Sequence, residues 1–97
     1  MLVQKEKNRI SFLEDGKELA FISFPDIDPK TVVIKTTYVD DTLRGQGIAK
    51  KLMEEAYLVI KSSNRKAILE CSYAIEYFRK NIEKQDIVQS CPYTSVG

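Results

Sequence analysis

Residues 31–49 read TVVIKTTYVDDTLRGQGIA, and this stretch decides the fold. Its first part, residues 31–39, is β-branched nearly throughout. That composition predicts one strand, because such side chains suit a pleated sheet and lose χ1 freedom in a helix. From Gly47 the apolar residues recur at spacings of three and four, which predicts an amphipathic helix over residues 47–61. A turn with two glycines therefore joins the best strand of the chain to its best helix.

Upstream of this stretch the sequence predicts a β-hairpin. Residues 9–14 and 17–24 each carry apolar residues suited to a strand, and Asp15-Gly16 between them is a common two-residue hairpin turn. The following residues, 26–30, indicate a polar turn.

Downstream of the stretch the sequence predicts a further strand and a further helix. Residues 66–71 indicate a short buried strand, and Ser72 is a suitable N-cap for a second helix with an apolar face. The last elements are a brief edge strand at Ile87-Val88 and a tail from Cys91 onward.

The order of these elements predicts an α/β fold. Its mixed sheet combines an antiparallel hairpin with a βαβ unit made of residues 31–39, 47–61 and 66–71, whose crossover should be right-handed and whose strands should be parallel. Ligands of such sheets bind beyond the carboxyl ends of the strands. We therefore expect the loop 40–46 and Cys71-Ser72 to meet at one site.

Size and composition limit the classes of function. The 97 residues support one domain, 1–97, with a core over about residues 8–86 and an edge strand or tail over 87–97. The net charge of +1 argues against a nucleic-acid partner. The apolar runs are too short for a membrane span, and the charged N-terminus argues against a signal peptide. We expect a cytoplasmic protein with reduced cysteines, monomeric or weakly dimeric through an exposed sheet edge. No histidine is present, and the Asp40-Asp41 pair lacks partner carboxylates, so no metal site is predicted.

The glycine turn is the strongest candidate site for a ligand. Glycine lets a ligand approach the main chain closely, and the first amides of the helix lack intrahelical partners, so the turn suits a phosphate or pyrophosphate. Arg44 adds a positive charge there. A purely structural turn is the alternative. A dinucleotide-binding loop is a weaker match because Lys50 stands where a third glycine belongs, and no Gly-Lys-Ser/Thr follows to make a P-loop.

Arg44-Gly45-Gln46-Gly47-Ile48-Ala49 resembles the R/Q-x-x-G-x-G/A loop of the GNAT acetyltransferases. The resemblance implies a truncated GNAT fold in which the amides of this loop hold the pyrophosphate of acetyl-CoA. It also implies that Val39 serves the pantetheine arm. The cofactor-binding residues expected on this basis are Val39, Arg44, Gly45, Gln46, Gly47, Ile48, Ala49 and Phe78.

Cys71-Ser72-Tyr73 resembles the second signature of small single-domain members of that family. Larger members carry a tyrosine at the position of Phe78, and that tyrosine can protonate the CoA thiolate. The usual general acid is therefore missing here. Tyr77 can replace the missing acid only if its side chain points inward. Cys71 follows a strand and precedes a helix, whose dipole favours the thiolate. Three roles stay open for Cys71: catalytic nucleophile, lining of the thioester pocket, and plain core residue.

The implied function is acetyl-CoA-dependent transfer of an acetyl group to an amine, on a small molecule or a protein. A module that binds CoA or acyl-CoA without catalysis is the alternative, and a small interaction domain with a structural glycine turn is the third hypothesis.

Overall fold

The computed structural model describes residues 2–90, and its elements follow the predicted order with additions. Cys91 and the rest of the predicted tail lie outside the described residues. The strands and helices are β1 (Leu2–Glu6), β2 (Arg9–Glu14), β3 (Lys17–Ser23), β4 (Asp26–Asp28), β5 (Thr31–Ile34), β6 (Thr36–Val39), a 3-10 turn η1 (Asp41–Leu43), α1 (Ile48–Ser62), β7 (Lys66–Leu69), α2 (Ser72–Lys80), a 3-10 segment η2 (Ile82–Ile87) and β8 (Val88–Ser90).

The predicted hairpin is confirmed. β2 and β3 pair antiparallel, with Glu14 opposite Lys17 at the closed end. Asp15 and Gly16 both have positive φ, 53° and 77°, which a two-residue turn between twisted strands requires. β1 adds to the outer edge of this hairpin as an antiparallel strand that the sequence did not indicate.

The prediction of one strand over residues 31–39 is wrong, because the stretch forms two strands with different partners. β5 pairs parallel with β7, as the βαβ unit predicts, whereas β6 pairs antiparallel with β3. Lys35 lies between them and donates its backbone N–H to the Ser23 carbonyl at 3.0 Å. Residues 2–90 therefore form two four-stranded sheets, β1-β2-β3-β6 and β4-β5-β7-β8. Residues 26–30, predicted as a turn, contain β4.

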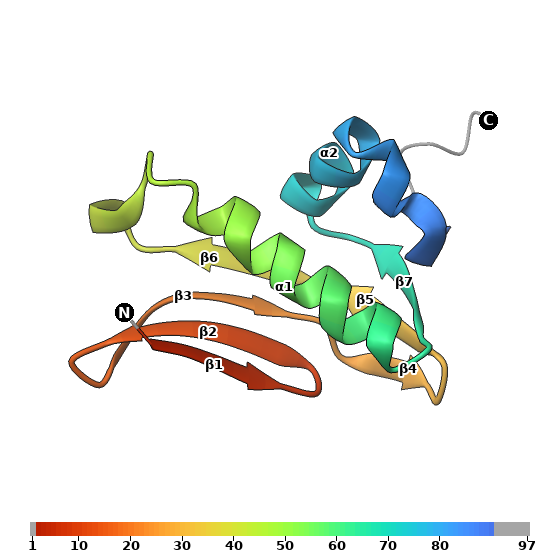
Figure 1. Cartoon of the computed structure of the whole chain (residues 1–97), viewed down its shortest axis with the longest axis horizontal. Helices are drawn as coiled ribbons and strands as arrows, with labels where there is room; N and C mark the ends of the chain where they lie inside the picture. Colours follow the sequence, from red (N-terminus) through yellow and green to blue (C-terminus); the bar gives the residue numbers. More distant parts are fainter. Residues whose placement is uncertain (1, 91–97) are drawn as a thin grey trace.

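The two sheets separate between β6 and β7, which pair with different strands and point away from each other (Figure 1). The ladder between β5 and β7 ends at Ile34 opposite Leu69. The Ile34 carbonyl then accepts the backbone N–H groups of both Glu70 and Cys71, at 3.0 and 3.1 Å. This irregularity turns the chain away from the sheet and starts α2 beside the end of β6.

Helix α1 lies across the strands and supplies much of the core (Figure 1). Its buried side chains occur at the spacing that predicted the helix; they are Ile48, Leu52, Met53, Ala56, Tyr57 and Ile60. Alternate residues of the strands face them, including Ile10, Ala20, Ile22, Val32 and Ile34, each fully buried. Helix α2 packs beside α1 through Phe78, whose ring centroid lies 6.5 Å from that of Tyr57.

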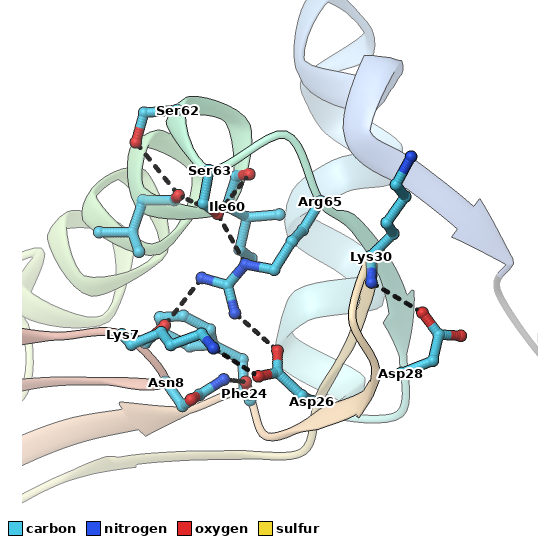
Figure 2. A network of polar contacts seen from close by, with 11 residues as sticks. Lys7, Asn8, Phe24, Asp26, Asp28, Lys30, Ile60, Ser62, Ser63 and Arg65 are labelled. Carbon is cyan, nitrogen blue, oxygen red and sulfur yellow. Dashed lines mark hydrogen bonds and ion pairs between the residues drawn. The ribbon is translucent and has the colours of Figure 1, made fainter.

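A buried arginine links three segments at the far end of α1. Figure 2 shows Arg65, 3% exposed, donating to the Asp26 carboxylate at 2.7 Å, to the Lys7 carbonyl at 2.8 Å and to Ser63 Oγ at 2.6 Å. These bonds hold the β1–β2 turn and the start of β4 against the α1–β7 turn. We call this group, Lys7, Asp26, Ser63 and Arg65, the Arg65 junction.

Candidate functional site

The loop between β6 and α1 is fixed at its start by Asp40. The Asp40 carboxylate accepts the backbone N–H of Thr42 at 3.0 Å and its hydroxyl at 2.6 Å. These hydrogen bonds from Thr42 lower the pKa of Asp40 below its usual value. The side chain acts as a cap for η1, so its role is to shape the loop.

The loop exposes its backbone at the two glycines. Gly45 and Gly47 have φ of 81° and 73°, in the left-handed region that favours glycine. A Cβ atom built on either residue would meet no atom within 4 Å, so the main chain there is open to an incoming group. Gly47 is the N-cap of α1 and provides no side-chain cap to the first amides of the helix. These amides are available to an anion.

A cavity of about 250 Å³ lies against this loop. Several predicted cofactor-binding residues line it, namely Val39, Arg44, Gly45, Gly47, Ile48 and Ala49. Leu43, Lys50 and Tyr73 complete the lining. Arg44 is paired with Asp41 at 3.1 Å, and its side chain remains largely exposed. The cavity combines main-chain donors and two cationic side chains with an apolar wall from the end of β6.

Two predicted cofactor-binding residues lie elsewhere. Gln46 donates its side-chain amide to the Thr42 carbonyl at 3.3 Å and lines a different cavity. Phe78 is 1% exposed and packs edge to face with Tyr77, their ring centroids 5.2 Å apart. The Tyr77 hydroxyl accepts a hydrogen bond from Lys84 Nζ at 3.0 Å. The structure thus places Phe78 and Tyr77 in the packing between α2 and its neighbours.

Cys71 lies at the N-cap of α2, where β7 ends. Its carbonyl accepts the backbone N–H of Ile75 at 3.0 Å, and its thiol is partly exposed. The Cys71 Sγ atom lies 3.5 Å from Thr37 Oγ1, within hydrogen-bonding distance for sulfur. Tyr73, two residues further on, lines the loop cavity with Val39. The start of α2 and the glycine loop therefore lie at one edge of the divided sheet.

Two residues of this site, Thr37 and Lys50, were missed from the sequence, and a third, Tyr73, was noted in the Cys71-Ser72-Tyr73 motif but expected to serve packing. Thr37 lies two residues before Val39 and so shares its face of the strand, a signal that was available. Lys50 is in the first turn of α1, next to the proposed anion position. Tyr73 is partly buried; burial, then nearby Tyr77, Glu54 and Cys71, raises the pKa of its hydroxyl, so the group stays a neutral donor.

Other kinds of site find no support in residues 2–90. Within that range, no group of three or more His, Cys, Asp or Glu side chains is arranged to hold a metal ion. Over the same residues, no helix has the length and apolar content needed to cross a membrane.

Comparison with known protein families matches residues 9–87 to the GCN5-related N-acetyltransferases, the GNAT family. The chain belongs to this family. A relative from Xenopus tropicalis, Protein NATD1, is 32% identical over 82 residues, which are 81% of this chain and 75% of the relative. Among solved structures, a GCN5-like protein from Staphylococcus aureus superposes with a TM-score of 0.74 and 28% identity, over 92% of this chain and 88% of that chain. The GNAT fold predicted from the loop motif is thereby confirmed.

A larger GNAT acetyltransferase with the same fold has been solved with a ligand. The enzyme from Elizabethkingia anophelis, solved with acetyl-CoA bound, matches 76% of this chain and 51% of its own, with a TM-score of 0.59 and 18% identity. At that identity the match shows the shared fold. The GNAT family supports acyl transfer as the general class of activity for this protein.

Proposed function

We propose that this protein transfers an acetyl group from acetyl-CoA to an amine acceptor. The observation that carries the proposal is the cavity at the glycine loop, where open main-chain amides, Arg44 and Lys50 surround one space. That set of donors suits a pyrophosphate. The pantetheine arm would run along the end of β6, past Val39. β6 is an edge strand of its sheet, so its side toward β7 has no strand partner.

We further propose that Cys71 carries the acetyl group. In the first step its thiolate sulfur attacks the thioester carbonyl carbon, a bond from that carbon to Cys71 Sγ forms, and the bond to the CoA sulfur breaks. The departing CoA thiolate takes a proton from water. In the second step a neutral amine attacks the acetyl carbon, the Cys71 thiolate leaves, and the new amide nitrogen loses a proton to water. The Thr37 hydroxyl accepts the Cys71 thiol proton at 3.5 Å, and once the thiol is ionised the same hydroxyl can rotate and donate to the thiolate in both steps.

The scheme requires a reduced thiol, which suits the cytoplasmic location expected from the sequence. The acceptor is an amine in its free-base form, because an ammonium group has no lone pair for the attack.

Intact-protein mass spectrometry after incubation with acetyl-CoA tests the covalent step. We expect one acetyl group on the wild-type protein, located at Cys71 by peptide mapping, and its loss on addition of a primary amine. Cys71→Ser should lack the adduct, whereas Cys91→Ser, the matched control for the other thiol, should keep it. Acetylation of an amine by Cys71→Ser at the wild-type rate would contradict the covalent route and leave direct transfer.

A non-catalytic CoA-binding module is the second candidate, and Phe78 favours it. The family's proton-donating tyrosine is replaced by this buried phenylalanine, and the hydroxyl of neighbouring Tyr77 is bonded to Lys84. Calorimetric titration separates the two functions: saturable binding of CoA with no acetyl transfer to a panel of amines supports the module.

A further inference from the structure

β1 forms one edge of its sheet, since the strand order is β1-β2-β3-β6, and Figure 1 shows it at the margin of the molecule. All of its residues are exposed, including the apolar Leu2 and Val3 at 73% and 44%. Helix α1 packs mainly on β2, β3 and β6, so it does not cover this edge. Such an edge presents a row of unpaired backbone groups to a further strand.

The register of β1 on β2 shows which backbone groups are free. A two-residue turn joins the strands and leaves Glu6 opposite Arg9. The pair that flanks such a turn exchanges both of its backbone hydrogen bonds, and pairs of this kind recur at every second residue. The N–H and C=O groups of Gln4 and Glu6 therefore face β2, whereas those of Val3 and Lys5 point away from the sheet.

Charged residues often protect a sheet edge from further pairing. The lysine within β1, Lys5, does not serve this purpose, because its Nζ atom lies 2.6 Å from Glu55 Oε1 on α1. Its charge is thus neutralised on the side of the sheet that α1 covers. β4, at one edge of the other sheet, differs, since it is three residues long and has aspartate at both ends. β1 is therefore more open to another strand than β4 is.

We infer that β1 is an interface between two copies of this protein, at which the two β1 strands pair antiparallel across a two-fold axis at Gln4. In this register Gln4 lies opposite Gln4 of the second copy, and Val3 lies opposite Lys5 of the second copy. Val3 and Lys5 carry the outward backbone groups, so these groups bond reciprocally across the axis. An axis at Lys5 would place two lysines opposite each other, which repulsion disfavours. An axis at Val3 would shorten the paired segment.

The second copy also meets a complementary charge. Val3 lies on the α1 side of the sheet and lines a cavity of about 570 Å³ together with Lys51, Glu54 and Glu55. Glu54 has no ion pair with any other of residues 2–90. Lys5 of the second copy, being opposite Val3, comes to the same side of the sheet and beside these carboxylates. The two-fold axis repeats this contact in the other direction.

This interface is independent of the proposed function. None of residues 2–6 lines the loop cavity, so the pairing of β1 joins the two copies into one continuous sheet and leaves that cavity open in each. Failure of either proposal therefore leaves the other standing.

Sedimentation velocity over a concentration series tests the interface. The contact of one short strand is small, so we expect a reversible monomer–dimer equilibrium with a dissociation constant on the order of 100 µM. Val3→Pro should remain monomeric, because proline removes an outward N–H group while an edge strand tolerates it. Val3→Thr is the matched control, since it keeps that N–H and should dimerise as the wild type does. A wild type that stays monomeric up to about 1 mM, or a Val3→Pro variant that dimerises equally, overturns the inference.

A cross-link tests the register separately, with Gln4→Cys in a background of Cys71→Ser and Cys91→Ser. The two introduced thiols should lie in a non-hydrogen-bonded pair with Cα atoms about 4.5 Å apart, which a disulfide spans. Mild oxidation should therefore give a covalent dimer on a non-reducing gel. Glu6→Cys in the same background is the control and should stay monomeric, because the two thiols would be separated by roughly 13 Å along the strands. Equal cross-linking of both variants, or none of Gln4→Cys, contradicts the two-fold axis at Gln4.

Discussion

Replacement of Arg65 by methionine should destabilise the protein more than the same replacement of an exposed arginine. The side chain of Arg65 is 2% exposed, and its guanidinium donates three hydrogen bonds within the Arg65 junction. Methionine keeps the aliphatic length but removes every donor. The Lys7 carbonyl and the Ser63 hydroxyl lose a charged partner, and Asp26 keeps its contact with Lys7 Nζ at 3.3 Å.

The expected loss is about 3 kcal/mol in the free energy of unfolding, since a bond from a charged group contributes about 1.5–3 kcal/mol and its removal leaves buried partners unpaired. A simple sum over three bonds would exceed this value. The Asp26 side chain is 28% exposed, so water replaces part of the lost contact. For a domain of this size the melting temperature should fall by roughly 10–20 °C.

Urea denaturation followed by circular dichroism measures the effect, with Arg79→Met as the control. The side chain of Arg79 is 63% exposed and its partner is Glu76, so its loss should change stability by less than about 0.5 kcal/mol. Equal stability of the Arg65 and Arg79 variants would refute the reasoning, because the junction would then add nothing beyond a surface ion pair.

The same variant should alter the response to acid. The hydrogen bond from Arg65 is the main cause of the lowered pKa of Asp26. A carboxyl whose folded-state pKa is lowered stabilises the protein above its unfolded pKa, about 3.9 for aspartate, and that contribution is lost as the pH falls through the folded value. The stability difference between the wild type and Arg65→Met should therefore narrow below about pH 4. A difference that stays constant down to pH 2 would contradict this account.

Three smaller changes test the loop, the core and the thiol. Gly47→Ala should cost about 1 kcal/mol by thermal denaturation because of its positive φ, and should also weaken CoA binding, whereas Gly16→Ala should cost the same and leave binding unchanged. Tyr57→Phe removes a hydrogen bond of 2.9 Å to a carboxylate and should lower stability by about 1 kcal/mol in urea denaturation. Thr37→Val should slow alkylation of Cys71 by iodoacetamide a few-fold, measured by peptide mapping, because it removes the hydroxyl that can rotate to donate to the ionised thiol. Unchanged CoA affinity in the first variant, or an unchanged alkylation rate in the last, would contradict the assigned roles.

The elements predicted correctly from the sequence are those with a local signal. The apolar spacing of α1 and the Asp15-Gly16 turn are each properties of a few neighbouring residues, and the structure has both. The glycine loop was predicted as an anion site from its residues alone, and the structure places an open cavity there. Whether the loop binds CoA is still a prediction.

The elements that the sequence did not indicate depend on distant partners. β1 is exposed along its whole length, so it has no apolar alternation, and it exists because the edge of β2 is available. The break at Lys35 arises because β6 pairs with β3, which precedes it in the sequence, whereas β5 pairs with β7, which follows it. Local β-propensity does not contain this choice of partners. Phe78 was expected at the cofactor but is buried, whereas Tyr73 lines the loop cavity. The reason is that the face of α2 that meets the loop depends on how α2 docks on α1.

The Arg65 junction also has a consequence for the time course of folding. Its bonds to Asp26 and to the Lys7 carbonyl span 39 and 58 residues of sequence, so they close long segments of chain. Closure of such segments costs entropy before any contact is gained, which favours local elements such as α1 and the β2–β3 hairpin as the first to form. Contacts absent from the transition state act mainly on the unfolding rate. The junction should therefore form late in folding, after the transition state. Its loss should speed unfolding and shorten the lifetime of the folded protein, while the refolding rate changes little.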